Sequence, residues 1–328
     1  MSHRILPARD VRSLAWVGDS LIDVVAGGTR YELHGESTRG SVRWAYPFDA
    51  AVTAPGSDFA VLYTRLGTKA LLLKNGQLVR ELNRSFYHAH RYEYPICLVP
   101  RGERTLLIHC PEVYNRLEIE DAESGERLTA RKTKQEDFFH SRLTPNPSGT
   151  TLASAGWVWQ PLNAIAYFSI DDALRDPAHL DASDWAAPHS ANLSYAEENS
   201  ICWLDDRRAV VTATGEPEEP DDDATTPRLL PNGVIVYDTS ARAVLSSVVL
   251  DQPAGNVVAV DDTHVIALFE HPRLVSLTDG RVEQEWPELA TGRQASSIVD
   301  VEQLPPAYAF DRRTRRLAVA QQDGIHVI

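Results

Sequence analysis

The sequence predicts an all-β fold, and three observations carry that prediction. Apolar and polar residues alternate over short runs such as TKALLLKNGQLVREL at 68–82, which is the period of a half-buried strand. Turn pairs that favour positive φ break these runs, among them Asn75-Gly76, Ser124-Gly125 and Asp279-Gly280. Helical periodicity is almost absent, and we expect at most a short helical turn within residues 169–185.

The strand pattern repeats along the chain. Fragments such as CLVPRGERTLLIHC (97–110) give a strand, a charged turn and a strand, and fragments such as GVIVYDTSARAVLSSVVL (233–250) give two more strands. Joined in order, they form four-strand meanders whose starts lie near residues 12, 49, 94, 138, 197, 254 and 305. This spacing, about 35 to 60 residues, is that of a repeat architecture.

The two ends of the chain complement each other. Residues 305–328 supply three strands of the last meander, and residues 3–7 offer the fourth. A ring closed in this way has no free sheet edge. The sequence therefore predicts a seven-bladed β-propeller of four-stranded antiparallel blades, one domain over 1–328, with an N-terminal strand joining the last blade. A two-domain β-sandwich protein is the alternative, but it would not explain the complementary ends.

Two fragments carry a family resemblance. NPSGTTLASAGW (146–157) is similar to the turn and second strand of WD40-like and YVTN-like repeats, and GVIVYDTSARAVLSSV (233–248) is similar to their last two strands. The repeat pattern that carries the resemblance covers nearly the whole chain. The sequence lacks the Gly-His and Trp-Asp dipeptides of true WD40 repeats. The resemblance implies a divergent propeller of this type.

Composition narrows the function classes. The 328 residues carry a formal net charge of −14, which argues against nucleic acid as a direct partner. No apolar run approaches the roughly 18 residues that span a bilayer, and Arg4, Arg9 and Asp10 stand where a signal peptide would be apolar. We expect a cytoplasmic protein without a membrane partner. Abundant alanine and arginine, with little lysine, point to a bacterial source.

Propeller geometry sorts the loops onto two faces. The loops from strand four to the next blade and from strand two to strand three share one face, called here the upper face. The upper loops 84–95, 131–141, 186–198 and 288–303 are long and rich in aromatic and charged residues, whereas the lower turns are short. Aromatic residues and arginine are enriched at protein interfaces. The predicted binding residues are Phe86, Tyr87, His88, His90, Arg91, Tyr92, Phe138, Phe139, His140, Trp157 and Trp159.

Some of these residues have a second interpretation. Trp157 and Trp159 lie two apart at a strand end and point to the same side, so they either pack between blades or join the aromatic surface. Phe138 and Phe139 either face a partner or form a small core beneath the loop. We expect Arg84 and Arg91 to reach partner carboxylates.

No catalytic motif emerges: GxSxG, HExxH, P-loop and GxGxxG patterns are missing. The sequence therefore predicts a non-enzymatic scaffold for protein–protein interaction in a bacterial multi-protein assembly, with protein partners, no cofactor and no metal. The alternative is a metal-dependent propeller hydrolase or lactonase at the mouth of the axial channel. Its candidate ligands are His88, His90, His140 and His189, with Glu93, Glu112, Asp137 and Glu197. The acidic run 216–223 is a solvated loop, a docking strip for a basic partner or a weak calcium site.

Overall fold

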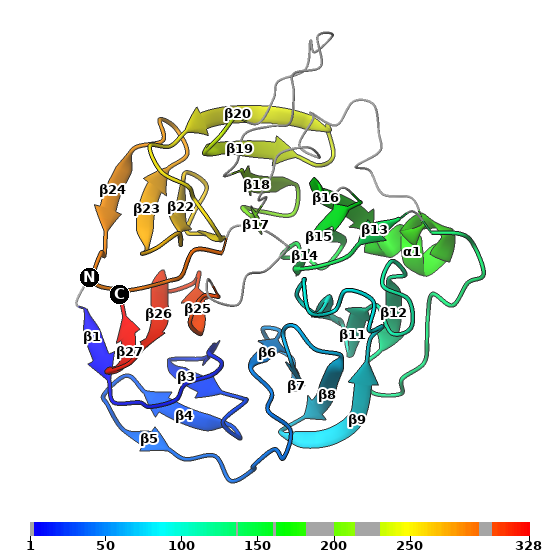
Figure 1. Ribbon diagram of the computed structural model, residues 1–328, viewed down its shortest axis with the longest axis horizontal. Helices are drawn as coiled ribbons and strands as arrows, with labels where there is room; N and C mark the ends of the chain where they lie inside the picture. The colour runs from blue at the N-terminus through cyan, green and yellow to red at the C-terminus, as the bar shows by residue number, and fades with distance from the viewer. Residues whose placement is uncertain (1–2, 136, 160–161, 182–199, 214–229, 295–303) are drawn as a thin grey trace.

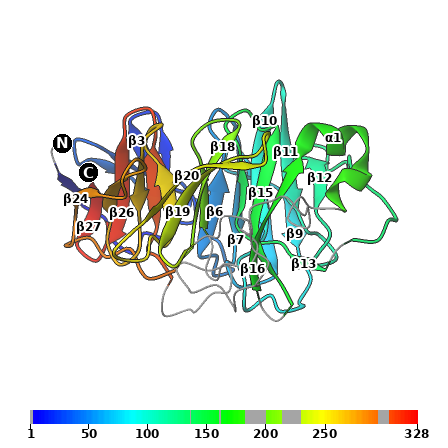
Figure 2. The ribbon, with the colours of Figure 1, turned by 90° about the horizontal axis from the view of Figure 1, so that it is seen from above.

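The computed structural model is a ring of seven antiparallel β-sheets around a central axis (Figure 1). It describes residues 3–135, 137–159, 162–181, 200–213, 230–294 and 304–328. Six sheets have four strands and one has three within this part of the chain. The predicted all-β, seven-bladed propeller is confirmed. Seen edge on in Figure 2, the ring is a thick disc whose strands run between its two faces.

The first two blades are regular meanders. In blade 2 the middle strands are mostly buried and the last strand is mostly exposed, because it forms the rim of the ring (Figure 1). Asn75 and Gly76 make its last hairpin turn with φ of 50° and 74°. The strands are β2 (Ala15–Val17), β3 (Ser20–Asp23), β4 (Thr29–Glu32) and β5 (Ser37–Thr38), then β6 (Ala50–Thr53), β7 (Phe59–Tyr63), β8 (Lys69–Lys74) and β9 (Gln77–Asn83).

Blade 3 departs from the regular pattern, because its fourth strand is reduced to the isolated bridge between Glu120 and Arg127. Lysine, arginine and threonine follow at 131–134, where alternating apolar residues would be needed to extend a strand. The blade consists of β10 (Ile96–Arg101), β11 (Arg104–His109) and β12 (Glu118–Asp121).

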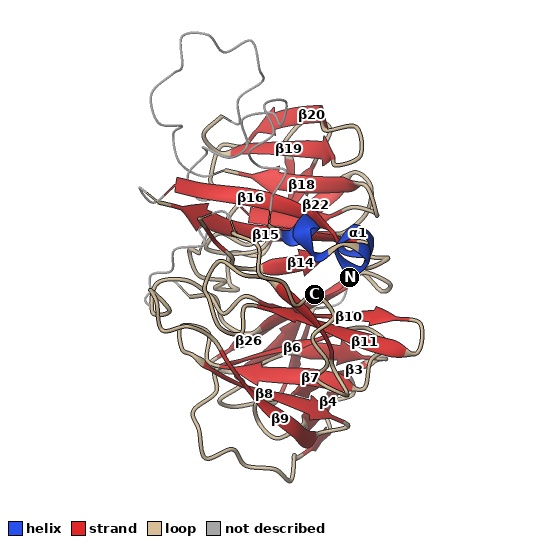
Figure 3. Ribbon diagram, turned by 90° about the vertical axis from the view of Figure 1, so that its right-hand side faces the viewer, coloured by secondary structure: helices blue, strands red, loops and turns tan. Residues whose placement is uncertain are grey.

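Blade 4 has a broken first strand and a helix at its rim. β13 and β14 pair with successive parts of β15, and Arg142, with φ of 41°, lies in the break between them. The helical turn expected within 169–185 is present as α1 (Figure 3), which has Ser169 as its N-cap. The elements are β13 (Phe138–Phe139), β14 (Leu143–Pro145), β15 (Thr151–Val158), β16 (Leu162–Ser169), α1 (Ile170–Arg175) and the 3₁₀ helix η1 (Pro177–Leu180).

Blades 5 and 6 again have four strands each. Their apolar faces pack blade to blade: Val210 and Val236 of blade 5 share one cluster with Val265 and Val275 of blade 6. Similar clusters lie between the other blades, as expected for sheets stacked around an axis. The strands are β17 (Ser200–Trp203), β18 (Arg208–Thr212), β19 (Gly233–Asp238) and β20 (Ala243–Val249), then β21 (Val257–Ala259), β22 (His264–Ala267), β23 (Arg273–Ser276) and β24 (Val282–Glu285).

Both ends of the chain build blade 7, as predicted. β1 (Arg4–Leu6) pairs antiparallel with β27 (Gly324–Val327), next to β26 (Arg316–Gln321) and β25 (Tyr308–Asp311). Figure 1 shows the two termini side by side. Leu6 is buried with Ile325 and Val327, so closure adds apolar contacts to the backbone pairing. No helix in the described residues is long and apolar enough to cross a bilayer.

Candidate functional site

Loops from three blades bring their aromatic residues together on the upper face. Tyr87, in the loop after β9, lies with its ring centroid 4.9 Å from Tyr114 and 5.8 Å from Phe139. His88 lies 5.4 Å from Trp159, centroid to centroid. We call this group the aromatic patch; it consists of the contacting rings of Tyr87, His88, Tyr92, Tyr114, Phe139, Trp157 and Trp159, and we include Phe86, the exposed neighbour of Tyr87 in the same loop.

The floor of the aromatic patch is a buried stack. Phe139 of β13 and Trp157 of β15 are register partners, and their ring centroids are 3.7 Å apart. Tyr92 packs edge-on against both rings. Gly156 allows this approach, because a Cβ there would lie 2.0 Å from the Phe139 carbonyl oxygen. Phe139 and Trp157 therefore pack as a small core beneath the loop.

The surface of the aromatic patch comes from residues that remain accessible. Phe86 is 85% exposed, Tyr87 44% and Trp159 45%. Trp159 lies just beyond the end of β15, so it escapes the burial of Trp157 although the two rings touch edge to face. His90 and Arg91 are also exposed, and His88 is half-buried. Six of the predicted binding residues thus reach the surface.

The other five predicted residues support the surface from below. Tyr92, Phe139 and Trp157 form the floor, and Phe138 belongs to the core between blades 3 and 4. His140 is buried against Ser154, with its Nδ1 3.2 Å from the hydroxyl oxygen. Burial, with the nearby charge of Arg131, lowers the pKa of His140 to about 3, so its imidazole is neutral.

Arg84 corrects an expectation. It is 4% exposed and cannot reach a partner carboxylate, because its guanidinium is directed into its own loop. The guanidinium also lies over the rings of Tyr92 and Tyr94, 4.6 and 4.9 Å from their centroids. Its side chain donates to the backbone carbonyls of Gly67 (2.7 Å), Ala89 (2.8 Å), Tyr92 (2.9 Å) and Glu93 (3.1 Å). Arg84 therefore holds the 84–95 loop in shape.

Those proposed metal ligands that the structure describes are not gathered into one site. The described residues contain no group of three or more His, Cys, Asp or Glu side chains placed to hold a metal ion. Glu112 forms an ion pair with Arg127 at 3.1 Å, and Asp137 accepts a hydrogen bond from the Tyr114 hydroxyl. His189, Glu197 and the acidic run 216–223 lie outside the described residues.

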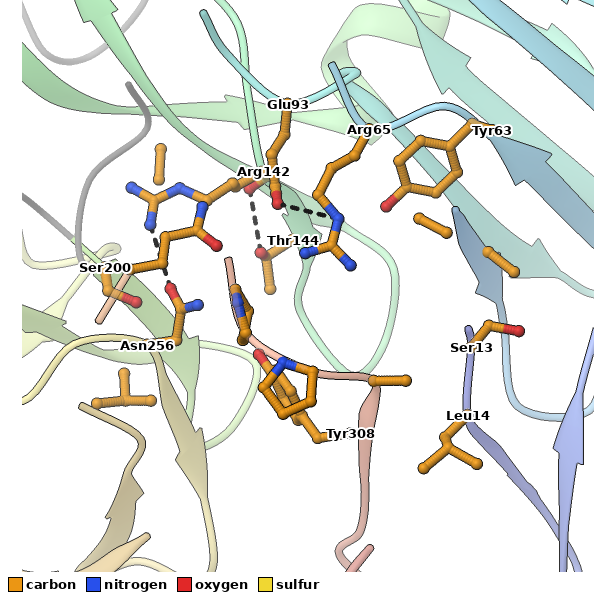
Figure 4. Close-up of a pocket in the computed structure, with 18 of the residues that line it drawn as sticks. Ser13, Leu14, Tyr63, Arg65, Glu93, Arg142, Thr144, Ser200, Asn256 and Tyr308 are labelled. Carbon is orange, nitrogen blue, oxygen red and sulfur yellow. Dashed lines mark hydrogen bonds and ion pairs between the residues drawn. The ribbon is translucent and has the colours of Figure 1, made fainter. Parts of the chain in front are cut away.

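A second feature of the upper half is a cavity on the ring axis, shown in Figure 4 and called here the central cavity. Its volume is about 330 Å³, and its wall is built by residues of six blades and by Glu93 of the 84–95 loop, which leads into blade 3. The 84–95 loop links it to the aromatic patch, since Glu93 lines the cavity while Tyr92 lies in the floor of the patch. Sequence reasoning missed this cavity, because its residues come from short segments in distant parts of the chain.

Charged and hydroxyl groups face one another in the central cavity. Arg65 Nε lies 3.8 Å from Glu93 Oε1, and Arg142 Nη1 donates to Asn256 Oδ1 at 3.3 Å (Figure 4). Burial lowers the pKa of Arg142 to about 10, which leaves it protonated at neutral pH. Burial also raises the pKa of Tyr308 to about 12, with Glu93 adding to the effect, so its hydroxyl remains a donor.

Comparison with known proteins supports the fold and goes no further. No family model and no curated protein matches this chain. A chain in the crystal structure of the mitotic checkpoint complex is similar, with a TM-score of 0.59 and 8% identity over 99% of this chain and 89% of that one. A chain of Kuenenia stuttgartiensis hydrazine synthase is also similar, with a TM-score of 0.58 and 13% identity over 98% of this chain and 96% of that one. At these identities the likeness shows a propeller fold, and the WD40-like repeat type stays a prediction.

Proposed function

We propose that the protein is a non-enzymatic scaffold, a single propeller domain over 1–328, that binds a protein partner within a bacterial, cytoplasmic assembly. The observation that carries this proposal is the aromatic patch, where exposed rings stand on a buried aromatic floor. Flat aromatic side chains in a fixed position lose little conformational entropy on binding, and they dominate the binding energy of many interfaces.

The surroundings of the aromatic patch suit a protein partner. Phe86 and Trp159 offer apolar area, while Arg91 and His90 add polar groups at the edge. An apolar centre with a polar rim is the usual anatomy of an interface. The similar chain from the mitotic checkpoint complex belongs to a multi-protein complex, which is in keeping with a propeller that works in an assembly. The hydrolase alternative has no comparable support, because its candidate ligands are dispersed or outside the described residues.

The test compares partner capture by matched variants. Affinity purification from the native organism, read by mass spectrometry, first identifies the proteins that the wild type retains. The double variant Phe86→Ala/Trp159→Ala is expected to weaken their binding at least tenfold, about 1.4 kcal/mol, with little change in melting temperature. The control Leu78→Ala/Leu245→Ala removes two other exposed apolar side chains, from the rim strands β9 and β20, and should bind normally.

A third variant distinguishes the two faces. Glu103→Ala/Arg104→Ala alters an exposed lower turn between β10 and β11. Loss of capture in this variant, with normal capture by Phe86→Ala/Trp159→Ala, would place the partner on the lower face and reject the proposal.

A further inference from the structure

We propose that the central cavity binds a small oxyanion, a carboxylate or phosphate group, between Arg65 and Arg142. This site is separate from the aromatic patch and does not depend on the scaffold function proposed above.

The first argument is charge. The described residues that line the central cavity include the arginines Arg12, Arg65 and Arg142 but only one acid, Glu93. The chain as a whole has a net charge of −14, so the net positive charge of the cavity lining is opposite in sign to that of the whole protein. Inside a protein the attraction between opposite charges is several times stronger than in water. The excess of positive charge in this lining therefore attracts anions.

The second argument is the state of Arg65. Its side chain is 15% exposed, and the carboxylate it faces is beyond hydrogen-bond distance, with 3.8 Å between Nε and Glu93 Oε1. Its guanidinium makes no hydrogen bond to any residue that the structure describes. Figure 4 shows the guanidinium directed into the cavity, near the Tyr63 hydroxyl. Such a planar fork of donors fits the two oxygens of a carboxylate or phosphate.

The third argument is that the backbone of Arg65 and the side chain of Arg142 are held in place before any ligand arrives. The Arg65 backbone is fixed by two hydrogen bonds: its N–H donates to Asp49 Oδ1 at 2.7 Å, and its carbonyl accepts from the Tyr94 N–H at 2.9 Å. Arg142 is positioned across the axis by Asn256 of blade 6. Binding at such a site costs little ordering of side chains or loops.

The volume of the central cavity limits the size of the ligand. A cavity of about 330 Å³ lies at the small end of the roughly 300–1,000 Å³ typical of ligand sites. It suits inorganic phosphate or a short dicarboxylate. Hydroxyls of Tyr63 and Tyr308 in the same wall can donate further hydrogen bonds, because burial raises the pKa of both and keeps them protonated.

The experiment measures binding to the full chain by titration calorimetry and thermal unfolding. One arm uses inorganic phosphate and the other uses succinate, each against sodium chloride at equal ionic strength. We expect saturable one-to-one binding in at least one arm, with a rise in melting temperature. Phosphate binding alone would identify a phosphate site, and succinate binding alone a carboxylate site.

Three variants test the residues. Arg65→Gln should weaken binding at least tenfold, and Glu93→Gln should strengthen it, because the competing carboxylate is removed. The opposite sign of Glu93→Gln separates a direct effect from general destabilisation. Arg104→Gln, an exposed arginine at the turn between β10 and β11 that does not line the cavity, should bind like the wild type. The proposal is overturned if neither anion binds at millimolar concentration, or if binding is unchanged in Arg65→Gln.

Discussion

Phe139 and Trp157 stack face to face across two neighbouring strands, with ring planes only 8° apart. Tyr114 continues the stack, with its ring centroid 4.2 Å from that of Phe139, and the exposed Tyr87 lies 4.9 Å from Tyr114. Stacked aromatic pairs contribute about 0.5–1.5 kcal/mol beyond the burial of their area. The exposed surface of the aromatic patch is therefore coupled directly to the packing of blade 4.

The stack requires a glycine beside it. Gly156→Ala would place a methyl group 2.0 Å from the Phe139 carbonyl oxygen and 2.7 Å from the Phe138 ring. We expect the free energy of unfolding to fall by about 2–3 kcal/mol, because the strands must move apart. Urea denaturation measures the change. Gly102→Ala is the comparison: it faces open space at φ of 60° and should cost about 1 kcal/mol. Equal losses in the two variants would argue against the close approach.

Closure of the ring can be tested with two adjacent residues of β1. Leu6 is 2% exposed and Ile5 is 52% exposed. Leu6→Ala should lower the free energy of unfolding by about 2–4 kcal/mol through the cavity it leaves, and Ile5→Ala should change it by less than about 0.5 kcal/mol. Deletion of residues 1–8 should lower the melting temperature or cause aggregation, since the edge of β27 becomes free. An unchanged melting temperature after deletion would contradict this role of β1.

Two arginines of one loop should behave differently. Arg84→Ala leaves several buried carbonyls without their donor, so we expect a loss of at least about 3 kcal/mol and faster amide exchange over 84–95. Arg91→Ala should stay within about 0.5 kcal/mol, because the side chain is exposed. Denaturation and hydrogen exchange of both variants give the comparison. Similar stabilities would mean that Arg84 does not hold the loop.

Glu120 makes stability depend on pH in the acid range. Burial alone would raise its pKa, but His109 and Arg80, with Nε2 and Nη2 at 3.4 and 2.7 Å, lower it to about 2. Arg127 Nε faces the same carboxylate at 3.7 Å. Because the folded pKa lies below the unfolded value, this stabilisation is present above about pH 4.5 and is lost as pH falls toward 2.

Glu120→Gln should therefore lower the melting temperature at pH 7 and flatten its decline between pH 4.5 and 2. Thermal unfolding across that range measures both effects. The matched control is Glu126→Gln, which removes an exposed carboxylate of the same region and should retain the wild-type profile. A decline as steep in Glu120→Gln as in the wild type would show that other groups control acid unfolding.

Metal removal should have no effect. Since the described residues gather no set of three metal ligands, we expect a chelator to leave the melting temperature unchanged. We also expect elemental analysis to find no stoichiometric zinc or calcium in the purified protein. One tightly held metal ion per chain would instead favour the hydrolase alternative.

The sequence alone determined the architecture, because its signals are local. Alternation of apolar residues and pairs such as Asn75-Gly76 specify strands and hairpins within a few residues, and repetition then gives the number of blades. The incomplete last repeat indicated that residues 3–7 close the ring, and β1 lies there. Local signals were weaker in blades 3 and 4, where the fourth strand of one and the first strand of the other are interrupted.

Only the tertiary structure decided which side chains are accessible. Arg84 and Arg91 look equivalent in the sequence, yet one fills its own loop and the other faces solvent, because burial depends on what neighbouring blades place around a residue. The central cavity could not be read from the chain for the same reason. Arg65 and Arg142 lie far apart in sequence and line the same cavity because a ring brings the inner ends of its blades to one place.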